Sequence, residues 1–190
     1  MSPIETVGVT TDGECGRATP ASRSLYASHV TELQVVLPGT PLADEIVRAY
    51  MSDVASRWYG RQATPGELEE AFRSEPYDEL QGTGGIFLVG VEDGRAVGCA
   101  GVRFGDGFAE LTKVFTRPDH RGQGLGGRLL EAAEQACVDR GITTLRLDTR
   151  AELREACALY ERNGFERVGP FNDEPYSDRW YLKVLDTGVR

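Results

Sequence analysis

The feature of the sequence that most constrains its fold is a glycine-packed stretch, RGQGLGG at residues 121–127, which is followed directly by an apolar, alanine-rich segment. The apolar spacing of that segment predicts a helix from about 124 to 140, so the glycines form a turn at the helix N-terminus. The backbone N–H groups there are unpaired, and the helix dipole is positive. Because glycine has no side chain, a phosphate can approach that backbone closely, and the stretch predicts an anion-binding turn.

Apolar runs and turn signals divide the chain into elements in the order βααβββαβαββ. Three strands joined by tight Asp-Gly turns predict an antiparallel meander before the glycine stretch, and two Thr-Pro pairs predict earlier helix starts. The order predicts an α/β (α+β) fold with one mixed, largely antiparallel sheet of about six to seven strands flanked by about four helices. The expected strands are 32–39, 86–91, 96–104, 109–116, 143–149, 165–169 and 179–185, and the expected helices are 40–60, 64–72, 124–140 and 152–163.

Length, charge and composition limit the domain organisation and the partners. The chain of 190 residues predicts a single domain at 30–190, preceded by a partly disordered extension at 1–29. A net charge of −9 without a basic cluster predicts no nucleic-acid partner. We recognise neither a signal peptide nor an apolar run of membrane-spanning length, so we expect no membrane partner. Four separated cysteines and two histidines predict free thiols, a cytoplasmic location and no metal site.

Two nucleotide-binding motifs compete for the glycine stretch. A P-loop requires a lysine and a Ser or Thr after its last glycine, and this chain has an arginine and a leucine there. The dinucleotide fingerprint GxGxxG is satisfied by Gly122, Gly124 and Gly127, with Asp148 at the distance of a ribose-binding acid. The preceding strands form a meander without crossover helices, so an NAD-binding Rossmann-type protein is the weaker alternative.

A third kind of site accounts for two motifs together. The stretch Arg121–Gly126 matches R/Q-x-x-G-x-G/A, and ACALYERNGF at 156–165 matches A-x-x-L-Y-x-x-x-G-F. With these motifs in this order of elements, residues 33–185 resemble the GCN5-related N-acetyltransferase (GNAT) superfamily. The resemblance implies a GNAT-like sheet that is splayed between the strands at 109–116 and 144–149, and it implies acetyl-CoA as the cofactor.

The same resemblance implies where acetyl-CoA binds. Its pyrophosphate would lie on the N–H groups of 121–127, and its pantetheine arm would pair with the strand before the turn. A backbone N–H near Val114 would polarise the thioester carbonyl. One contact is not carried over, because Leu153 stands where many relatives have an asparagine. The implied cofactor-binding residues are Val114, Phe115, Thr116, Arg121, Gly122, Gln123, Gly124, Leu125, Gly126, Gly127, Ala156 and Tyr160.

Catalysis requires a proton donor and a proton acceptor. Tyr160 falls where many family members place the general acid that protonates the departing CoA thiolate, although a tyrosine that only packs is the alternative. Glu110 is the first candidate for the general base, because strand alternation places it on one face with Thr112 and Val114. A cross-strand ion pair is its alternative role. Cys157 has no basic partner, so we expect direct attack in a ternary complex rather than a covalent enzyme intermediate.

The acceptor is expected to be a primary amine, with a small molecule favoured and a protein acceptor left open. An acidic surface and aromatic residues favour a cation. The alternatives are a non-catalytic acyl-CoA-binding sensor or interaction module and the NAD-binding protein described above, and a homodimer is common among relatives. The candidate substrate residues are Trp58, Tyr59, Asp148, Asp173, Glu174 and Tyr176.

Overall fold

The computed structural model describes residues 31–186, so the predicted extension at 1–29 lies outside the described part of the chain. The order of elements is as predicted, with a 3-10 helix at Pro118–His120 in addition. The helices are α1 (Pro41–Tyr59), α2 (Pro65–Ser74), α3 (Leu125–Val138) and α4 (Arg154–Arg162). The strands are β1 (Glu32–Val35), β2 (Gly85–Glu92), β3 (Arg95–Phe104), β4 (Ala109–Thr116), β5 (Thr144–Thr149), β6 (Glu166–Val168) and β7 (Arg179–Val184).

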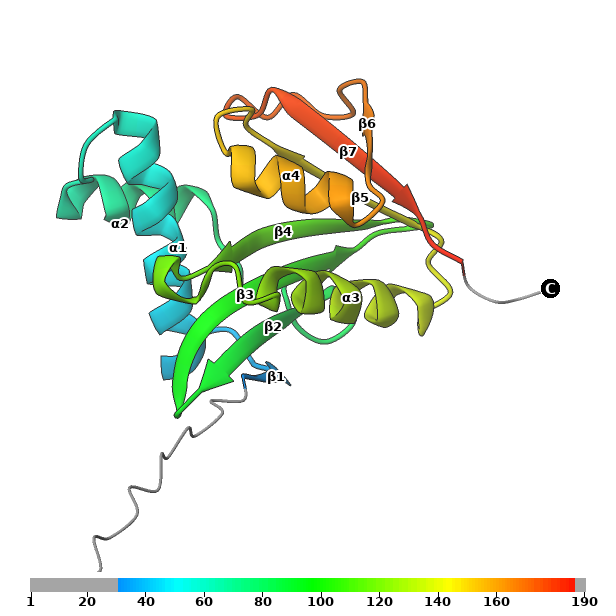
Figure 1. Cartoon of the computed structure of the whole chain (residues 1–190), viewed down its shortest axis with the longest axis horizontal. Coiled ribbons are helices and arrows are strands. Elements are labelled where there is room, and N and C mark those ends of the chain that lie inside the picture. The colour runs from blue at the N-terminus through cyan, green and yellow to red at the C-terminus, as the bar shows by residue number, and fades with distance from the viewer. Residues whose placement is uncertain (1–30, 187–190) are drawn as a thin grey trace, which may run out of the picture.

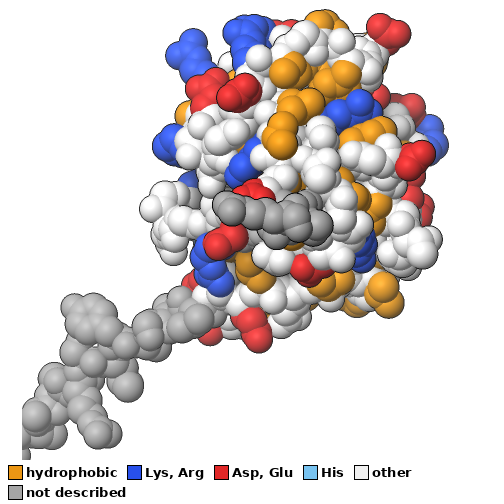
Figure 2. Space-filling view, turned by 90° about the vertical axis from the view of Figure 1, so that its right-hand side faces the viewer, with side chains coloured by type: hydrophobic (Ala, Val, Ile, Leu, Met, Phe, Trp, Pro, Cys, Tyr) orange, Lys and Arg blue, Asp and Glu red, His pale blue; other side chains and the backbone are white. Residues whose placement is uncertain are grey.

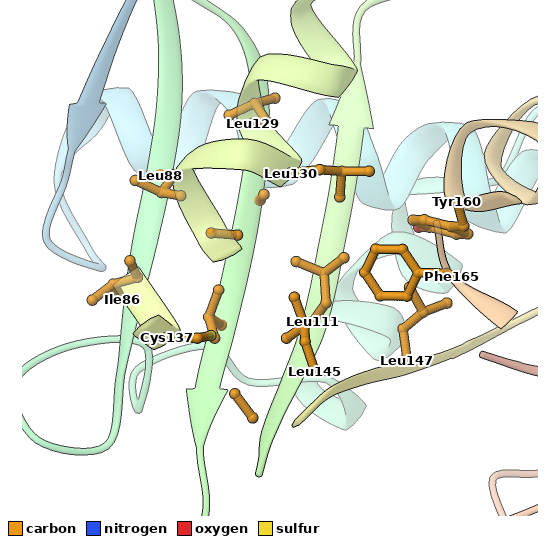
Figure 3. Packing of buried hydrophobic residues seen from close by; sticks show 14 of the residues in the cluster. Ile86, Leu88, Leu111, Leu129, Leu130, Cys137, Leu145, Leu147, Tyr160 and Phe165 are labelled. Carbon is orange, nitrogen blue, oxygen red and sulfur yellow. The ribbon is translucent and has the colours of Figure 1, made fainter. Parts of the chain in front are cut away.

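The seven strands form one sheet in the order β1-β2-β3-β4-β5-β7-β6, in which β4 and β5 are the only parallel neighbours among the described strands. The mixed, largely antiparallel sheet predicted from the sequence is therefore confirmed. Helices α3 and α4 cover one face of the sheet, and α1 covers the other (Figure 1). Figure 3 shows the core of the first face, where Leu129 and Leu130 of α3 pack in one cluster with Leu88 of β2 and Leu111 of β4, and where Tyr160 and Phe165 lie on the side of Leu111.

Local signals explain how the helices begin and end. Thr64 and Glu67 form the predicted capping box at the start of α2. Thr40 precedes α1 as predicted, but its hydroxyl donates to the carbonyl of Leu37 at 2.8 Å and does not cap the helix. Gly60 ends α1 in the left-handed conformation at φ 64°. None of the described helices is long and apolar enough to cross a membrane.

The sheet opens between β4 and β5. These strands pair only at Ala109↔Leu145 and Glu110↔Arg146, after which they diverge towards their C-terminal ends (Figure 1). The splay predicted between 109–116 and 144–149 is confirmed. From residue 111 onwards, the backbone of β4 on this side has no strand partner among the described residues, and an unpaired strand edge is a template for an extended ligand.

A β-bulge lies in β4 beside this opening. Cys99 pairs with Phe115 and Gly101 with Thr112, so Ala100 of β3 faces two residues of β4, Lys113 and Val114. The bulge reverses the alternation of side chains: Leu111 packs in the core under α3, whereas Phe115 packs in the core under α1. The expectation that Glu110 and Val114 share a face is wrong for this reason, because Val114 packs on the α3 side.

Candidate active site

The glycine turn connects β4 to α3, and its glycines have separate structural roles. Gly122 and Gly124 have φ values of 76° and 83°, a left-handed conformation that side chains disfavour. Gly124 is the N-cap of α3, and no side chain caps this helix. The N–H groups of its first turn are therefore available to a ligand. Gly126 has a different role: it allows α3 and α4 to pack closely, because a Cβ there would lie 3.0 Å from Leu159 of α4.

The side chain of Arg121 folds back from the turn towards the opening of the sheet. Its Nε donates to the carbonyl of Thr116 at 3.0 Å, and its Nη atoms lie 3.5 Å from Asp53 of α1 and 3.6 Å from Glu155 of α4. Glu155 also pairs with Arg57 at 2.5 Å. Arg121 therefore joins the two helices that flank the wide end of the opening. Gln123 donates to the carbonyl of Asp119 at 3.4 Å and stays at the surface.

Tyr160 lies on α4 beside the opening. Its ring is 5% exposed and packs against Phe165 and Tyr181, with centroids 5.8 and 5.9 Å away. Burial raises the pKa of its phenol well above the usual value, so the group keeps its proton. The hydroxyl has no hydrogen-bond partner among residues 31–186, and every enclosed side-chain oxygen in that part of the protein has one. The hydroxyl is therefore available to donate a hydrogen bond to a bound ligand.

Glu110 lies where β4 and β5 still pair, away from the wide end of the opening. Its Oε2 accepts from Nη2 of Arg146 at 3.2 Å, and its Oε1 lies 3.6 Å from Nη1 of Arg103. The guanidinium of Arg146 is itself stacked between Phe108 and Phe171, 3.9 and 4.3 Å from their centroids. The cross-strand ion pair considered as an alternative is therefore present, and a role for Glu110 as general base stays a prediction.

Asp148 at the end of β5 holds the loop between β6 and β7. One oxygen accepts from Nδ2 of Asn172 at 2.8 Å, and the other accepts from the hydroxyl of Ser177. Asn172 in turn accepts from Nε1 of Trp180 at 2.7 Å. Both carboxylate oxygens of Asp148 thus fasten the loop, so the structure gives this predicted substrate residue a positioning role.

The loop and the end of α1 enclose a small cleft of about 210 Å³. The rings of Trp58 and Tyr176 meet edge to face at 5.2 Å, and the guanidinium of Arg150 lies 5.1 Å from the Trp58 ring. Two predicted substrate residues are thereby brought together, whereas Tyr59 packs against Arg61, and Asp173 and Glu174 are exposed outside the cleft. The lining residues are Trp58, Arg150, Glu152, Pro175, Tyr176, Ser177 and Asp178.

Sequence reasoning misses three polar residues near the opening: Tyr50, Glu75 and Lys113. The apolar spacing of α1 includes Tyr50, so the pattern alone indicates a core residue there. Lys113 is buried, and the sequence does hold a signal for it, because it alternates with Leu111 and Phe115 in the apolar phase of its strand. Glu75 follows the last residue of α2 and has no sequence signal of its own.

Comparisons with known proteins agree with this architecture. Residues 51–165 match the model of the "Acetyltransferase (GNAT) family". The chain belongs to this acetyltransferase family. Its cofactor is acetyl-CoA, and the matched residues include the glycine turn, the open edge of β4 and Tyr160. A single parallel strand pair is also incompatible with the parallel sheet of a Rossmann fold, so the NAD-binding alternative is wrong.

Individual relatives of the GNAT chain differ in the acceptors that their names give. It is 36% identical over 92 residues to an IAA acetyltransferase of Azospirillum brasilense, covering 47% of this chain and 59% of that protein. It is 44% identical over 60 residues to the ribosomal protein bS18-alanine N-acetyltransferase of Escherichia coli, covering 32% and 40%. These matches span less than two thirds of either relative's length.

A solved structure shows how far the fold extends. A "putative acyl-CoA N-acyltransferase" of Klebsiella pneumoniae aligns with 82% of this chain and 98% of its own, at a TM-score of 0.63 and 27% identity. Nearly the whole of that protein therefore has a counterpart in the GNAT domain described above.

Proposed function

We propose that the chain transfers the acetyl group of acetyl-CoA to a primary amine by direct attack in a ternary complex. The observation that carries the proposal is the convergence of three features at one opening. These are the uncapped glycine turn, the unpaired edge of β4 and the buried hydroxyl of Tyr160, which has no hydrogen-bond partner among the described residues. A cofactor-binding sensor would need the first two features but has no use for a buried phenol beside the thioester.

The residues present fit acetyl-CoA. The N–H groups of the first turn of α3 would hold its pyrophosphate, since the glycines leave open space around Gly122 and Gly124. The edge of β4 from Val114 to Thr116 would pair with the pantetheine arm. Acetyl-CoA supplies an acyl thioester whose carbon an amine can attack. Tyr160 then donates its proton to the sulfur that leaves, and its raised pKa keeps that proton in place beforehand.

A small molecule is the acceptor that we favour. The cleft lined by Trp58 and Tyr176 has a volume suited to the body of a small amine, whose apolar part the aromatic rings would contact. The cation position on the Trp58 ring is taken by the guanidinium of Arg150, 5.1 Å away. The relatives' names support both classes, a small molecule for the IAA acetyltransferase and a protein for the bS18-alanine enzyme. Figure 2 shows a face on which basic and acidic side chains are interspersed, and it offers no continuous basic surface to a nucleic acid.

The described cysteines, Cys99, Cys137 and Cys157, are free thiols. They are consistent with the cytoplasmic location that we propose for the reaction. Burial raises the pKa of the Cys137 thiol to about 11, and Cys157 is half-buried. The Cys137 thiol therefore lacks the lowered pKa of a reactive nucleophile, and the Cys157 thiol donates to the backbone carbonyl of Arg150 at 3.6 Å. Both observations favour direct transfer.

Thermal unfolding with acetyl-CoA, CoA, NAD or ATP tests cofactor choice. Acetyl-CoA at about 100 times its dissociation constant is expected to stabilise the protein by about 2.7 kcal/mol, whereas NAD and ATP leave the unfolding midpoint unchanged. Thiol release is then measured with tyramine, spermidine and a peptide with a free N-terminal alanine. Stabilisation by acetyl-CoA without turnover of any of these amines would favour the sensor.

Replacing Trp58 by alanine tests the cleft. Loss of the indole removes one wall, so the KM for the best of the three amines is expected to rise about tenfold, while the KM for acetyl-CoA does not change. Leu37→Ala is the matched control, because Leu37 is also an exposed apolar side chain but lies outside the cleft. An equal effect of both substitutions would contradict the assignment of the cleft.

A further inference from the structure

The bulge in β4 carries an unusual residue. Of the 21 basic residues in the chain only two are lysines, Lys113 and Lys183. The side chain of Lys113 is 1% exposed, and its backbone has a φ of 50°, which is rare for a residue other than glycine. A left-handed backbone and a buried ammonium both cost free energy, and such costs concentrate at functional sites.

Lys113 lies among groups from three elements on the α1 face of the sheet. Its Nζ is 3.3 Å from Oε2 of Glu75, the residue after α2, and 5.8 Å from the ring centroid of Tyr50 on α1. Burial lowers the pKa of the Lys113 ammonium, and the Glu75 carboxylate opposes that shift. Val114, the expected N–H donor to the thioester carbonyl, is the next residue of β4. These three side chains therefore lie next to the expected N–H donor in β4, on the face of the sheet opposite α4.

Tyr50 of α1 packs against the end of β4 that borders the opening. Its ring meets Phe115 edge to face at 6.1 Å, and its hydroxyl has no hydrogen-bond partner in the part of the chain that the structure describes. This hydroxyl can therefore hydrogen-bond to a bound ligand. Burial raises the pKa of Tyr50, and the negative charge of Glu75 raises it further, so the phenol keeps its proton.

Glu75 is better placed than Glu110 to receive an ammonium group. Its side chain is 46% exposed, and Lys113 is the one cation that the structure pairs with it among the described residues. Glu110 is 20% exposed and lies between two guanidinium groups. A carboxylate that keeps one oxygen open to solvent can still accept a proton from a substrate, since geometry is the first requirement of a general base.

We propose that Glu75 and Tyr50 receive the acceptor amine, with Glu75 as its proton acceptor and Lys113 as the residue that positions Glu75. This assignment rests on the proposed acetyltransfer. The ammonium gives one proton to Glu75, its nitrogen bonds to the thioester carbon, and the carbon–sulfur bond breaks with its electron pair on sulfur. Tyr160 protonates that sulfur, and the second proton that the nitrogen sheds restores the phenol. One proton per turnover leaves from Glu75 to water.

The first test is Glu75→Gln, assayed with whichever of tyramine, spermidine or the alanine peptide the wild type acetylates fastest. We expect kcat/KM for that amine to fall about 100-fold, with the KM for acetyl-CoA within about twofold of the wild type. Tyr50→Phe should lower kcat/KM about tenfold, since one hydrogen bond to the amine is lost. Glu70→Gln on α2, the helix that Glu75 follows, is the control, because Glu70 pairs only with Arg73 at the surface in the described chain.

The substitution Lys113→Met tests whether Lys113 positions Glu75 or only stabilises the fold. Removing a buried charge whose partner is half exposed should leave the unfolding midpoint unchanged or raise it, yet kcat/KM for the amine should fall as far as in E75Q. Because Lys113 acts through Glu75, the double variant should be no slower than E75Q alone. If K113M does not fold, the kinetics of E75Q decide the assignment of Glu75.

The outcomes distinguish this inference from the function on which it rests. If E75Q turns over the amine as fast as the wild type does, Glu75 is not the proton acceptor, and the proposal of acetyltransfer stands. Multiplicative losses in the double variant overturn the positioning role of Lys113. If the KM of E75Q for acetyl-CoA rises by the same factor as its kcat/KM for the amine falls, the substitution damages the fold. That outcome also counts against the assignment of Glu75. Absence of wild-type turnover with all three amines overturns both proposals.

Discussion

Replacing Gly124 by valine is expected to abolish the stabilisation of the protein by acetyl-CoA. Gly124 has a φ of 83°, and a β-branched residue there costs about 1–2 kcal/mol of backbone strain. It also puts a side chain into the space beside the first turn of α3, where the pyrophosphate would lie. We therefore expect G124V to fold with a lowered midpoint and to show no measurable shift with acetyl-CoA at the concentration that stabilises the wild type by about 2.7 kcal/mol.

Gly107→Val is the matched control for this substitution. Gly107 lies in the turn between β3 and β4 and has a φ of 79°, and a Cβ added there would meet no atom within 4 Å, just as at Gly124. Both substitutions impose the same kind of strain, but only one lies at the glycine turn. G107V should keep the full shift with acetyl-CoA. Equal shifts for G124V and the wild type would show that the cofactor does not use the turn.

Replacing Tyr160 by phenylalanine is expected to lower kcat at least about 100-fold while the protein stays folded and binds acetyl-CoA. The hydroxyl has no hydrogen-bond partner in the described chain, so its loss should change the free energy of unfolding by less than about 1 kcal/mol. The ring contacts with Phe165 and Tyr181 remain. What is lost is the proton for the departing thiolate, and general acids contribute factors of about 10² to 10⁴.

The measurement pairs steady-state thiol release with thermal unfolding in the presence and absence of acetyl-CoA. Tyr181→Phe is the comparison for stability, because Tyr181 is buried in the same cluster and its hydroxyl donates to Glu161 at 2.9 Å. Y181F should lose more stability than Y160F and keep more activity. A Y160F protein with wild-type kcat would reduce Tyr160 to a packing residue, the alternative raised from the sequence.

Local signals account for the parts of the site that can be predicted from the sequence. The glycines at 122 and 124 are required by backbone conformation, and that requirement does not depend on distant residues. The capping box of Thr64 and Glu67 and the Asp-Gly turns are equally local. Because such signals occur at the ends of most elements, the order of strands and helices could be predicted, and with it the splayed sheet implied by the family resemblance.

Predictions that rely on regular alternation or on a single residue's chemistry are less accurate. The phase of β4 is the clearest case, because one extra residue at Lys113 moves Val114 to the α3 side and Phe115 to the α1 side. Glu110 and Asp148 are both carboxylates near the site, but each is engaged by other side chains. Arg146 pairs with the first, while Asn172 and Ser177 donate to the second, and no pattern within either strand indicates these partners.

The sequence by itself determined the element order, the glycine turn and the family, because each depends on residues that are neighbours along the chain. Only the tertiary structure decided which side chains surround the opening between β4 and β5. The register of β3 against β4 produces the bulge, and the packing of α1 and α2 beneath it brings Tyr50 and Glu75 to Lys113. Glu75 and Lys113 are 38 positions apart in the sequence, so their side chains come into contact only because the helices pack against the sheet.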